Sequence, residues 1–146
     1  MLVTPEMNIL SLVEDDAAAH GAPACVLCDE SQFFTREQAD QLFLVTVDLG
    51  IPVICYGLRA DFMLRGFPGS TRLLELAHTI EELKTICACG RKAICNGRKI
   101  NGEYVFEGAQ IAIDTVDNVE YQSLCPQCWY REYRSFLKRH GKTAQE

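Results

Sequence analysis

The segment that shapes this chain reads Ala24-Cys25-Val26-Leu27-Cys28-Asp29-Glu30-Ser31-Gln32-Phe33-Phe34. Its first five residues are small or apolar and do not alternate with polar residues, which is typical of a strand buried on both faces of a parallel sheet. Two adjacent acids, Asp29 and Glu30, follow that strand. In parallel sheets ligands bind beyond the carboxyl ends of the strands, where an acid can hold Mg²⁺ or accept a proton from a hydroxyl group. The alternative interpretation is that the two acids only mark where the strand meets water.

Helical and strand-like segments flank this stretch. Thr4-Pro5-Glu6 predicts a helix start before it. After it, Thr35 and Gln38 have the spacing of a capping box, and apolar residues then recur at helical spacing up to Gly50. Residues 52–56 form a second apolar run. A strand, a helix and a strand joined by short connections predict a βαβ unit whose two strands are parallel.

The character of the sequence changes near Lys84. Before it lie a loop rich in Gly and Arg (residues 57–69) and a short helix that we expect to start at Ser70. After it, short strand-like runs alternate with Asn96-Gly97 and Asn101-Gly102, and Asn-Gly pairs favour tight hairpins. An amphipathic helix is expected from about residue 127 to 139. We therefore divide the chain into an α/β core (1–83) and a small β module (84–146).

Composition limits the classes of partner. The 146 residues carry a formal net charge of −6, which argues against binding a nucleic-acid backbone by bulk electrostatics. The basic stretch 131–142 is interpreted as a solvated helix face. No apolar run approaches the roughly 20 residues that a membrane span needs, and no secretory signal is visible. We expect a cytoplasmic protein with neither nucleic-acid nor membrane partners.

Eight cysteines are many for such a chain, and four of them form two close pairs. These pairs are Cys87 with Cys89 and Cys125 with Cys128, a set that can supply the four thiolates of a tetrahedral zinc site. Gly90 and Pro126 favour the tight turns that such a site needs. Four protein ligands leave no open position, so the zinc would be structural. The alternative is a set of reduced, buried thiols.

The remaining cysteines and the histidines give weaker signals. Cys25 and Cys28 also form C-x-x-C, but residues three apart on a strand point to opposite faces and are poor joint ligands. Cys55 is expected in the core. A zinc deaminase needs H-x-E, and none of the three histidines is followed two places on by a glutamate.

Several motifs, taken together, resemble the zinc-containing (type II) thymidine kinases. Asp29-Glu30-Ser31-Gln32-Phe33 resembles the D-E-[AS]-Q-F motif of that family. Residues 52–62 are similar to its bacterial members, and residues 83–93 to its first zinc-ligand segment. Tyr121-Gln122-Ser123-Leu124-Cys125 resembles its Y-x-S-[VL]-C motif. The resemblance covers about residues 24 to 133, in the order of the family.

The resemblance implies phosphorylation of the thymidine 5′-hydroxyl to dTMP with ATP and Mg²⁺. Glu30 would be the general base and Asp29 the Walker-B-type acid, with Ser31 and Gln32 in the same Mg²⁺- and ATP-binding stretch. The residues expected around thymine are Phe33, Leu58, Phe62, Ile111, Ala112, Ile113 and Tyr121. The last four belong to a lasso loop that closes over the nucleoside. The family also implies a homotetramer.

Alternatives remain for three of these residues. Phe33 and Phe62 could be ordinary core residues. Tyr121 could be a surface residue of a hairpin.

Two features depart from the family pattern. Residues 114–120 make the lasso slightly longer than the Gly-Gly turn of many relatives. The family also opens with a strand and a phosphate-binding loop, G-x-x-x-x-G-K-[ST], and this motif does not occur in the 146 residues. We therefore expect an α/β fold: a parallel-sheet, P-loop-kinase-like core whose N-terminal part is missing, with a small zinc-binding β-hairpin module.

The lack of this motif leads to two functional hypotheses. As a thymidine kinase relative without the ATP cradle, the chain is predicted to have little or no kinase activity. The alternative is a non-catalytic, truncated relative that serves as a zinc-stabilised interaction or assembly protein. A zinc-ribbon nucleic-acid binder ranks third, because the net charge is negative.

Overall fold

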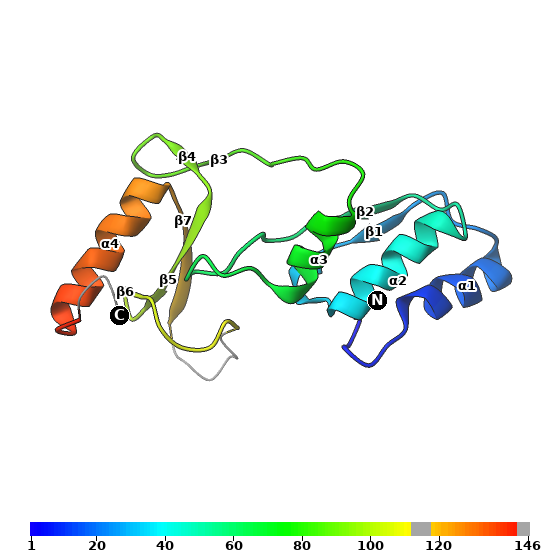
Figure 1. The fold of residues 1–146 in the computed structure, drawn as a ribbon, viewed down its shortest axis with the longest axis horizontal. Coiled ribbons are helices and arrows are strands. Elements are labelled where there is room, and N and C mark those ends of the chain that lie inside the picture. The colour runs from blue at the N-terminus through cyan, green and yellow to red at the C-terminus, as the bar shows by residue number, and fades with distance from the viewer. Residues whose placement is uncertain (112–117, 143–146) are drawn as a thin grey trace. The chain divides into compact units, whose positions relative to one another are not determined.

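The computed structural model describes residues 1–111 and 118–142 (Figure 1). The chain divides into two compact units. Unit 1 comprises Met1–Arg59 and Gly66–Ile80, and unit 2 comprises Ala60–Arg65 and Glu81–Glu146. Residues 60–65, which the sequence analysis assigned to the core, thus belong to the second unit. Within the described ranges no helix has the length and apolar character to cross a membrane.

Unit 1 contains a parallel pair of strands, β1 (Val26–Cys28) and β2 (Val53–Cys55), connected through helix α2 (Arg36–Val47). Val26 lies opposite Val53, and Cys28 lies opposite Cys55. The predicted strand–helix–strand arrangement with parallel strands is therefore confirmed.

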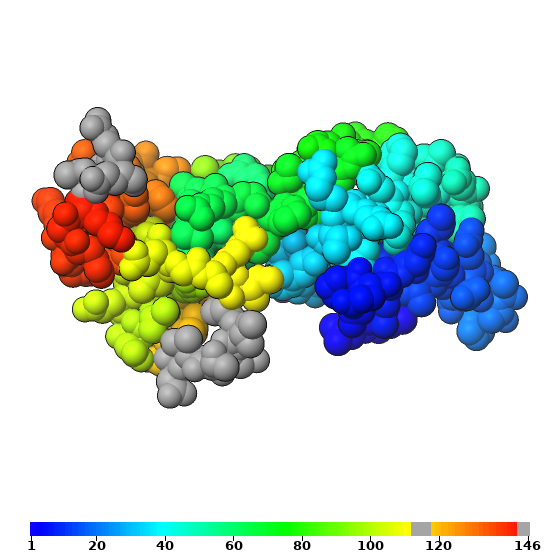
Figure 2. Space-filling view, turned by 60° about the horizontal axis from the view of Figure 1, so that its bottom comes forward, coloured from blue at the N-terminus to red at the C-terminus, as the bar shows by residue number. Residues whose placement is uncertain are grey.

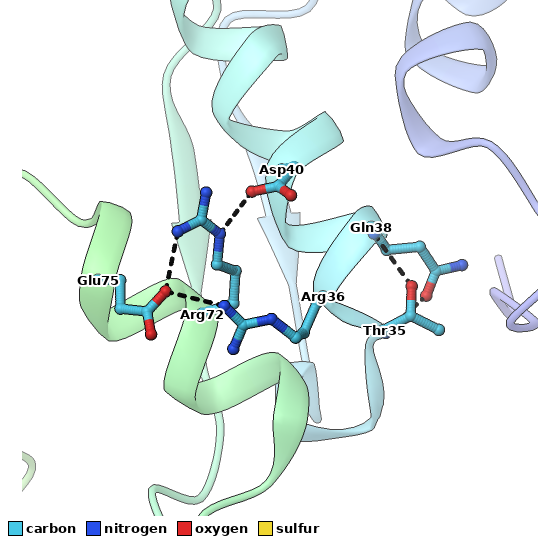
Figure 3. Close-up of polar contacts among 6 residues, drawn as sticks. All are labelled: Thr35, Arg36, Gln38, Asp40, Arg72 and Glu75. Carbon is cyan, nitrogen blue, oxygen red and sulfur yellow. Dashed lines mark hydrogen bonds and ion pairs between the residues drawn. The ribbon is translucent and has the colours of Figure 1, made fainter.

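A reciprocal capping box starts helix α2 (Figure 3). The Thr35 hydroxyl accepts a hydrogen bond from the Gln38 backbone N–H at 3.1 Å, and the Gln38 side-chain oxygen accepts one from the Thr35 N–H at 3.1 Å. The Gln38 side-chain nitrogen also donates to the carbonyls of Thr4 (2.7 Å) and Met7 (3.0 Å). The box predicted from sequence is confirmed, and it also anchors the N-terminal segment.

Helix α1 (Ile9–His20) begins later than predicted. Thr4 does not start it. Instead, the Thr4 carbonyl accepts from the Met7 N–H (3.1 Å) in a turn, and the Asn8 side chain caps the helix by accepting from the Ser11 N–H (3.0 Å). Asn is as good an N-cap as Thr, and the contacts to Gln38 favour the turn. The blue N-terminal region lies beside the cyan region of α2 (Figure 2).

Helix α3 (Pro68–Leu76), by contrast, starts before the predicted residue, Ser70. Pro68 occupies its first turn, where a missing N–H costs nothing, and the Ser70 hydroxyl donates to the Leu58 carbonyl (2.6 Å) instead of capping the helix. An exposed ion-pair network joins α3 to α2 (Figure 3). In it, Arg72 binds Asp40 at 2.6 Å and Glu75 at 2.8 Å, and Arg36 binds Glu75 at 3.1 Å.

Among the described residues of unit 1, the helices cover one face of the sheet. Cys28 packs with Ile9 and Leu42 in the core cluster of this unit, and Cys55 packs against that cluster as expected. The opposite face carries Leu27 and Ile54, which are 68% and 45% exposed. The prediction of a strand buried on both faces is therefore wrong for this structure, because the helices of unit 1 cover only the side of the sheet that carries Cys28.

Unit 2 combines two small antiparallel sheets with one helix. Strands β3 (Thr85–Ile86) and β4 (Lys92–Ala93) form a hairpin. Strands β6 (Glu103–Val105), β5 (Cys95–Ile100) and β7 (Val119–Leu124) form a three-stranded sheet in that order. Helix α4 (Pro126–Arg139) matches the predicted C-terminal helix. Phe106 lies at the centre of an aromatic cluster, with ring centroids 5.1 to 5.6 Å from Trp129, Tyr133 and Phe136.

Only one of the two Asn-Gly pairs forms a turn. Asn101 and Gly102 both have positive φ and connect β5 to β6, as predicted. Gly97 instead lies within β5, opposite Gln122. A Cβ at Gly97 would stand 2.7 Å from the Tyr104 ring, so close packing rather than a turn explains this glycine.

The capping box gives a first prediction. Thr35→Ala removes the hydroxyl that satisfies the Gln38 N–H and should lower the free energy of unfolding by about 1 kcal/mol. Urea denaturation measures the change. Thr85→Ala, at an exposed threonine of β3, is the control and should change stability by less than half as much. Equal losses in the two variants would contradict the role of the box.

Candidate functional site

The carboxyl ends of β1 and β2 lie side by side, and hydrogen bonds join the turns that follow them. The Tyr56 carbonyl accepts from both the Ser31 backbone N–H (2.9 Å) and the Ser31 hydroxyl (2.8 Å). The Tyr56 N–H in turn donates to the Cys28 carbonyl (2.8 Å). Both loops therefore leave the sheet at the edge where the sequence predicts a ligand site.

Glu30 has a left-handed backbone conformation, with φ 50° and ψ 36°. For a residue with a Cβ this conformation costs about 1 kcal/mol or more, and such strain concentrates at functional sites. The Glu30 N–H donates to the Asp29 carboxylate (2.9 Å), and both acids are exposed. The chain then enters a short 3₁₀ turn, η1 (Ser31–Phe33).

Gln32 fixes the Glu30 carboxylate. It is almost fully buried, its side-chain N–H donates to Glu30 Oε2 (2.5 Å), and its oxygen accepts from the Leu58 N–H (3.0 Å). One carboxylate oxygen of Glu30 is thereby held in place by a residue anchored to the loop after β2. Such a carboxylate can accept a proton from a hydroxyl group that approaches the exposed acid.

Two glycines allow the segments around the acids to approach closely. A Cβ at Gly57 would stand 2.6 Å from the Ser31 hydroxyl and 2.8 Å from the Gln32 side-chain oxygen. A Cβ at Gly69 would stand 2.3 Å from the Phe34 carbonyl. The sequence analysis did not single out these glycines, because only the spatial neighbours show that a side chain would not fit.

The residues expected around thymine are divided between the units. In unit 1, Phe33 is 50% exposed, with its ring edge-to-face to that of Phe67 at 6.0 Å, and Leu58 is 44% exposed. Phe33 is thus not a core residue.

In unit 2, Ile111 and Tyr121 are exposed, whereas Phe62 is 1% exposed and packs as a core residue. Ala112 and Ile113 lie outside the described residues.

The four cysteines predicted as ligands come together in unit 2. All four Sγ atoms lie within 4.8 Å of one another, and those of Cys89 and Cys125 are 3.6 Å apart. Thiolates at 2.3 Å around a tetrahedral zinc ion stand about 3.8 Å apart, so the donor set and its spacing fit a metal ion.

Two turns supply these ligands. In the β3–β4 hairpin the Cys87 N–H donates to the Arg91 carbonyl (2.8 Å), and Gly90, with φ 85°, closes the turn by donating to the Cys87 carbonyl (2.8 Å). At the start of α4 the Cys125 sulfur accepts from the Cys128 N–H (3.5 Å). Gly90 and Pro126 thus lie in the two turns that carry the ligands, as the sequence analysis predicted.

Backbone amides favour the thiolate form of three ligands. The Cys89 and Cys125 amides lower the pKa of Cys87, the Arg91 amide lowers that of Cys89, and the Cys128 amide lowers that of Cys125. Hydrogen bonding with Cys89 and Cys125 raises the pKa of Cys128 to about 12. A bound cation would displace the proton of any ligand that is still a thiol, because metal coordination requires the thiolate.

Comparisons with known proteins cover most of the chain. A family model described as thymidine kinase matches residues 3–129. The thymidine kinase of Ruegeria pomeroyi is 44% identical over 129 residues, which are 88% of this chain and 64% of that protein. The thymidine kinase of Chromobacterium violaceum is 48% identical over 120 residues, 80% of this chain and 64% of that protein. The thymidine kinase of Legionella pneumophila (strain Paris) is 52% identical over 103 residues, which are 70% of this chain and 48% of that protein. The chain spans less than two thirds of each of these relatives.

The cysteine cluster gives a second prediction. Trp129, the single tryptophan, follows Cys128 directly and is buried in the aromatic cluster. Removing bound metal with a chelator should expose it, so its fluorescence emission should shift to longer wavelength. Cys128→Ser should lower the metal content measured by mass spectrometry, while Cys25→Ser, outside the cluster, should not. An unchanged metal content in Cys128→Ser would contradict the assignment.

Proposed function

This chain belongs to the thymidine kinase family, and we propose that it acts in the phosphorylation of the thymidine 5′-hydroxyl by ATP, with Glu30 as the general base. The observation that supports this most directly is the strained Glu30, whose carboxylate is fixed by the buried Gln32 at the carboxyl ends of two parallel strands. Family membership supports a phosphotransferase role for the chain.

In the proposed reaction the thymidine 5′-oxygen attacks the γ-phosphorus of ATP while its proton passes to the Glu30 carboxylate. The bond between the γ-phosphorus and the β,γ-bridging oxygen breaks, and ADP leaves. Phosphoryl transfer depends chiefly on positioning and on neutralising charge. Gln32 would orient Glu30 for this step, since it bonds both the carboxylate and the Leu58 backbone.

Asp29 is proposed to hold Mg²⁺, directly or through water. Its carboxylate is exposed at the end of β1, and carboxylate oxygens suit this ion. When bound, Mg²⁺ neutralises the charge of the phosphates. Asp29 accepts from the Glu30 N–H, so the same residue also stabilises the turn that presents the base.

The half-exposed side chains of Phe33 and Leu58 in unit 1 are proposed to contact thymine, and Ile111 and Tyr121 stay predictions from the family resemblance. Apolar side chains that stay exposed beside charged groups are typical of small-molecule sites. Ala112 and Ile113 stay predictions from the family resemblance. The buried Phe62 ring is better suited to a supporting role than to a face of the pocket.

Cys87, Cys89, Cys125 and Cys128 are proposed to bind Zn²⁺. Four thiolates at this spacing are typical of zinc, and with four protein ligands the ion has no open position for a substrate. The zinc would therefore stabilise unit 2 and take no part in the chemistry. Homotetrameric assembly and a cytoplasmic location stay predictions of the sequence analysis.

A binding and turnover experiment tests the proposal. The zinc-loaded chain should bind thymidine in calorimetry, and Phe33→Ala should weaken binding about 10-fold because the apolar contact is lost. Leu44→Ala, at an exposed leucine of α2, is the control and should bind like the wild type. Absence of thymidine binding by the wild type would contradict the proposal.

Turnover separates the kinase from the alternative, a non-catalytic relative that serves in assembly. Because G-x-x-x-x-G-K-[ST] does not occur in these residues, we predict little or no dTMP formation by the 146-residue chain alone. Any turnover that is found should fall about 100-fold or more in Glu30→Gln, which cannot accept the proton. Turnover that survives this substitution would contradict the role of Glu30.

A further inference from the structure

Arg98, in strand β5, is a buried cation that the sequence analysis did not single out. It is 4% exposed, and its guanidinium group donates to the carbonyls of Ala109 (2.8 Å) and Glu107 (3.0 Å). The guanidinium carbon lies 3.6 Å from the centre of the Phe62 ring. In the described part of the chain its Nε has no hydrogen-bond partner.

A buried charge without a counter-charge is costly, so its presence calls for a reason. The ion pairs found between described residues do not include Arg98. A guanidinium group is planar, can bond two carbonyls at once and can stack on an aromatic ring, which a lysine cannot do equally well. The two carbonyl bonds and the stacking on Phe62 therefore indicate that Arg98 fixes two segments of the chain to strand β5.

The first of these segments is Ala60–Arg65. The buried Asp61 carboxylate accepts from the backbone N–H groups of Met63 (2.8 Å) and Arg65 (2.9 Å), which sets the shape of the turn. The Phe62 carbonyl accepts from the Trp129 indole N–H at 2.9 Å. Together with the Arg98–Phe62 stacking, these bonds fix the segment within unit 2.

The second segment is residues 107–111. Arg98 holds two of its carbonyls, and the Gln110 side chain donates to the other oxygen of Asp61 (3.2 Å). Gly108, with φ 109°, lies against the guanidinium group, and a Cβ there would stand 3.0 Å from Arg98 Nη2. Arg98 and Asp61 thus join residues 60–65 to residues 107–111.

We propose that Arg98 is a positioning residue for the nucleoside, which it serves by fixing residues 107–111 and the Phe62 segment in one arrangement. This inference rests on the proposed function, because Ile111 ends the second segment and leads into the predicted lasso. Arg98 itself does not touch thymidine in this scheme. It orders in advance the segment that ends at Ile111, so that nucleoside binding does not have to order this segment.

The test compares Arg98→Met with Arg98→Lys in the zinc-loaded chain. Arg98→Met keeps an unbranched apolar stem but loses both carbonyl bonds and the charge. Its dissociation constant for thymidine should rise about 10- to 100-fold, the range expected when charge-assisted hydrogen bonds are lost. The dissociation constant of Arg98→Lys should lie between those of the wild type and Arg98→Met. Lys99→Met, which removes the neighbouring cation on β5, is the control and should bind like the wild type.

Hydrogen exchange followed by mass spectrometry separates this proposal from the proposed function. Amides of residues 60–65 and 107–111 should exchange faster in Arg98→Met, while peptides of unit 1 and the metal content stay unchanged. Unchanged exchange, or unchanged thymidine affinity in a wild type that binds thymidine, would overturn the positioning role. If the wild type does not bind thymidine, the proposed function fails and the exchange data still decide whether Arg98 fixes the segments.

If Arg98→Met does not fold, Asp61→Asn tests the same connection between residues 60–65 and residues 107–111. The amide keeps the shape of the carboxylate but has only one acceptor oxygen, so it cannot accept the bonds from Met63, Arg65 and Gln110 together. Faster exchange in both segments is expected, and no change in either would overturn the proposal.

Discussion

The double hydrogen bond from Ser31 to the Tyr56 carbonyl holds together the two turns on which the acidic site depends. It joins the residue after Glu30 to the residue before Gly57, at the carboxyl ends of the two strands. Once these turns are joined, a side chain at position 57 would collide with Ser31 and Gln32, so glycine is required. The same approach brings Gln32 within reach of the Leu58 N–H. The orientation of Glu30 is thus a consequence of strand pairing.

Unit 2 meets a different constraint, because its sheets are small and its core is one aromatic cluster. Small modules of this kind commonly need a metal or disulfides in addition to a hydrophobic core. Cys125 and Cys128 belong to the buried cluster that contains Phe106 and Trp129, so the ligands and the core are one structure. Metal binding and packing of the aromatic side chains should therefore depend on each other.

Features that carry a sequence signal, such as a capping pair or the spacing of cysteines, could mostly be predicted, whereas features set only by packing against distant residues could not. The capping box of Thr35 and Gln38 and the turns around the cysteines are local, and they form as expected. Asn96-Gly97 has the same local signal as Asn101-Gly102, but packing against Tyr104 and Leu124 places it within a strand. The exposure of Leu27 depends on which elements cover the sheet. Arg98 and Asp61 carry no sequence signal of burial, because charged residues are usually exposed.

The loop between β2 and α3 is held at its ends by contacts within unit 1 and in its middle by contacts within unit 2. Its ends belong to unit 1, where Leu58 bonds Gln32 through its N–H and Ser70 through its carbonyl. Its middle, Ala60–Arg65, belongs to unit 2, where Arg98, Trp129 and Asp61 fix it. The covalent chain therefore connects Leu58, which anchors the residue that orients the proposed base, with the segment that Arg98 fixes. A change in the metal cluster can reach this loop through Trp129, which follows a ligand directly and holds Phe62. A zinc ion bound as proposed would then influence the proposed thymidine binding without contacting the substrate.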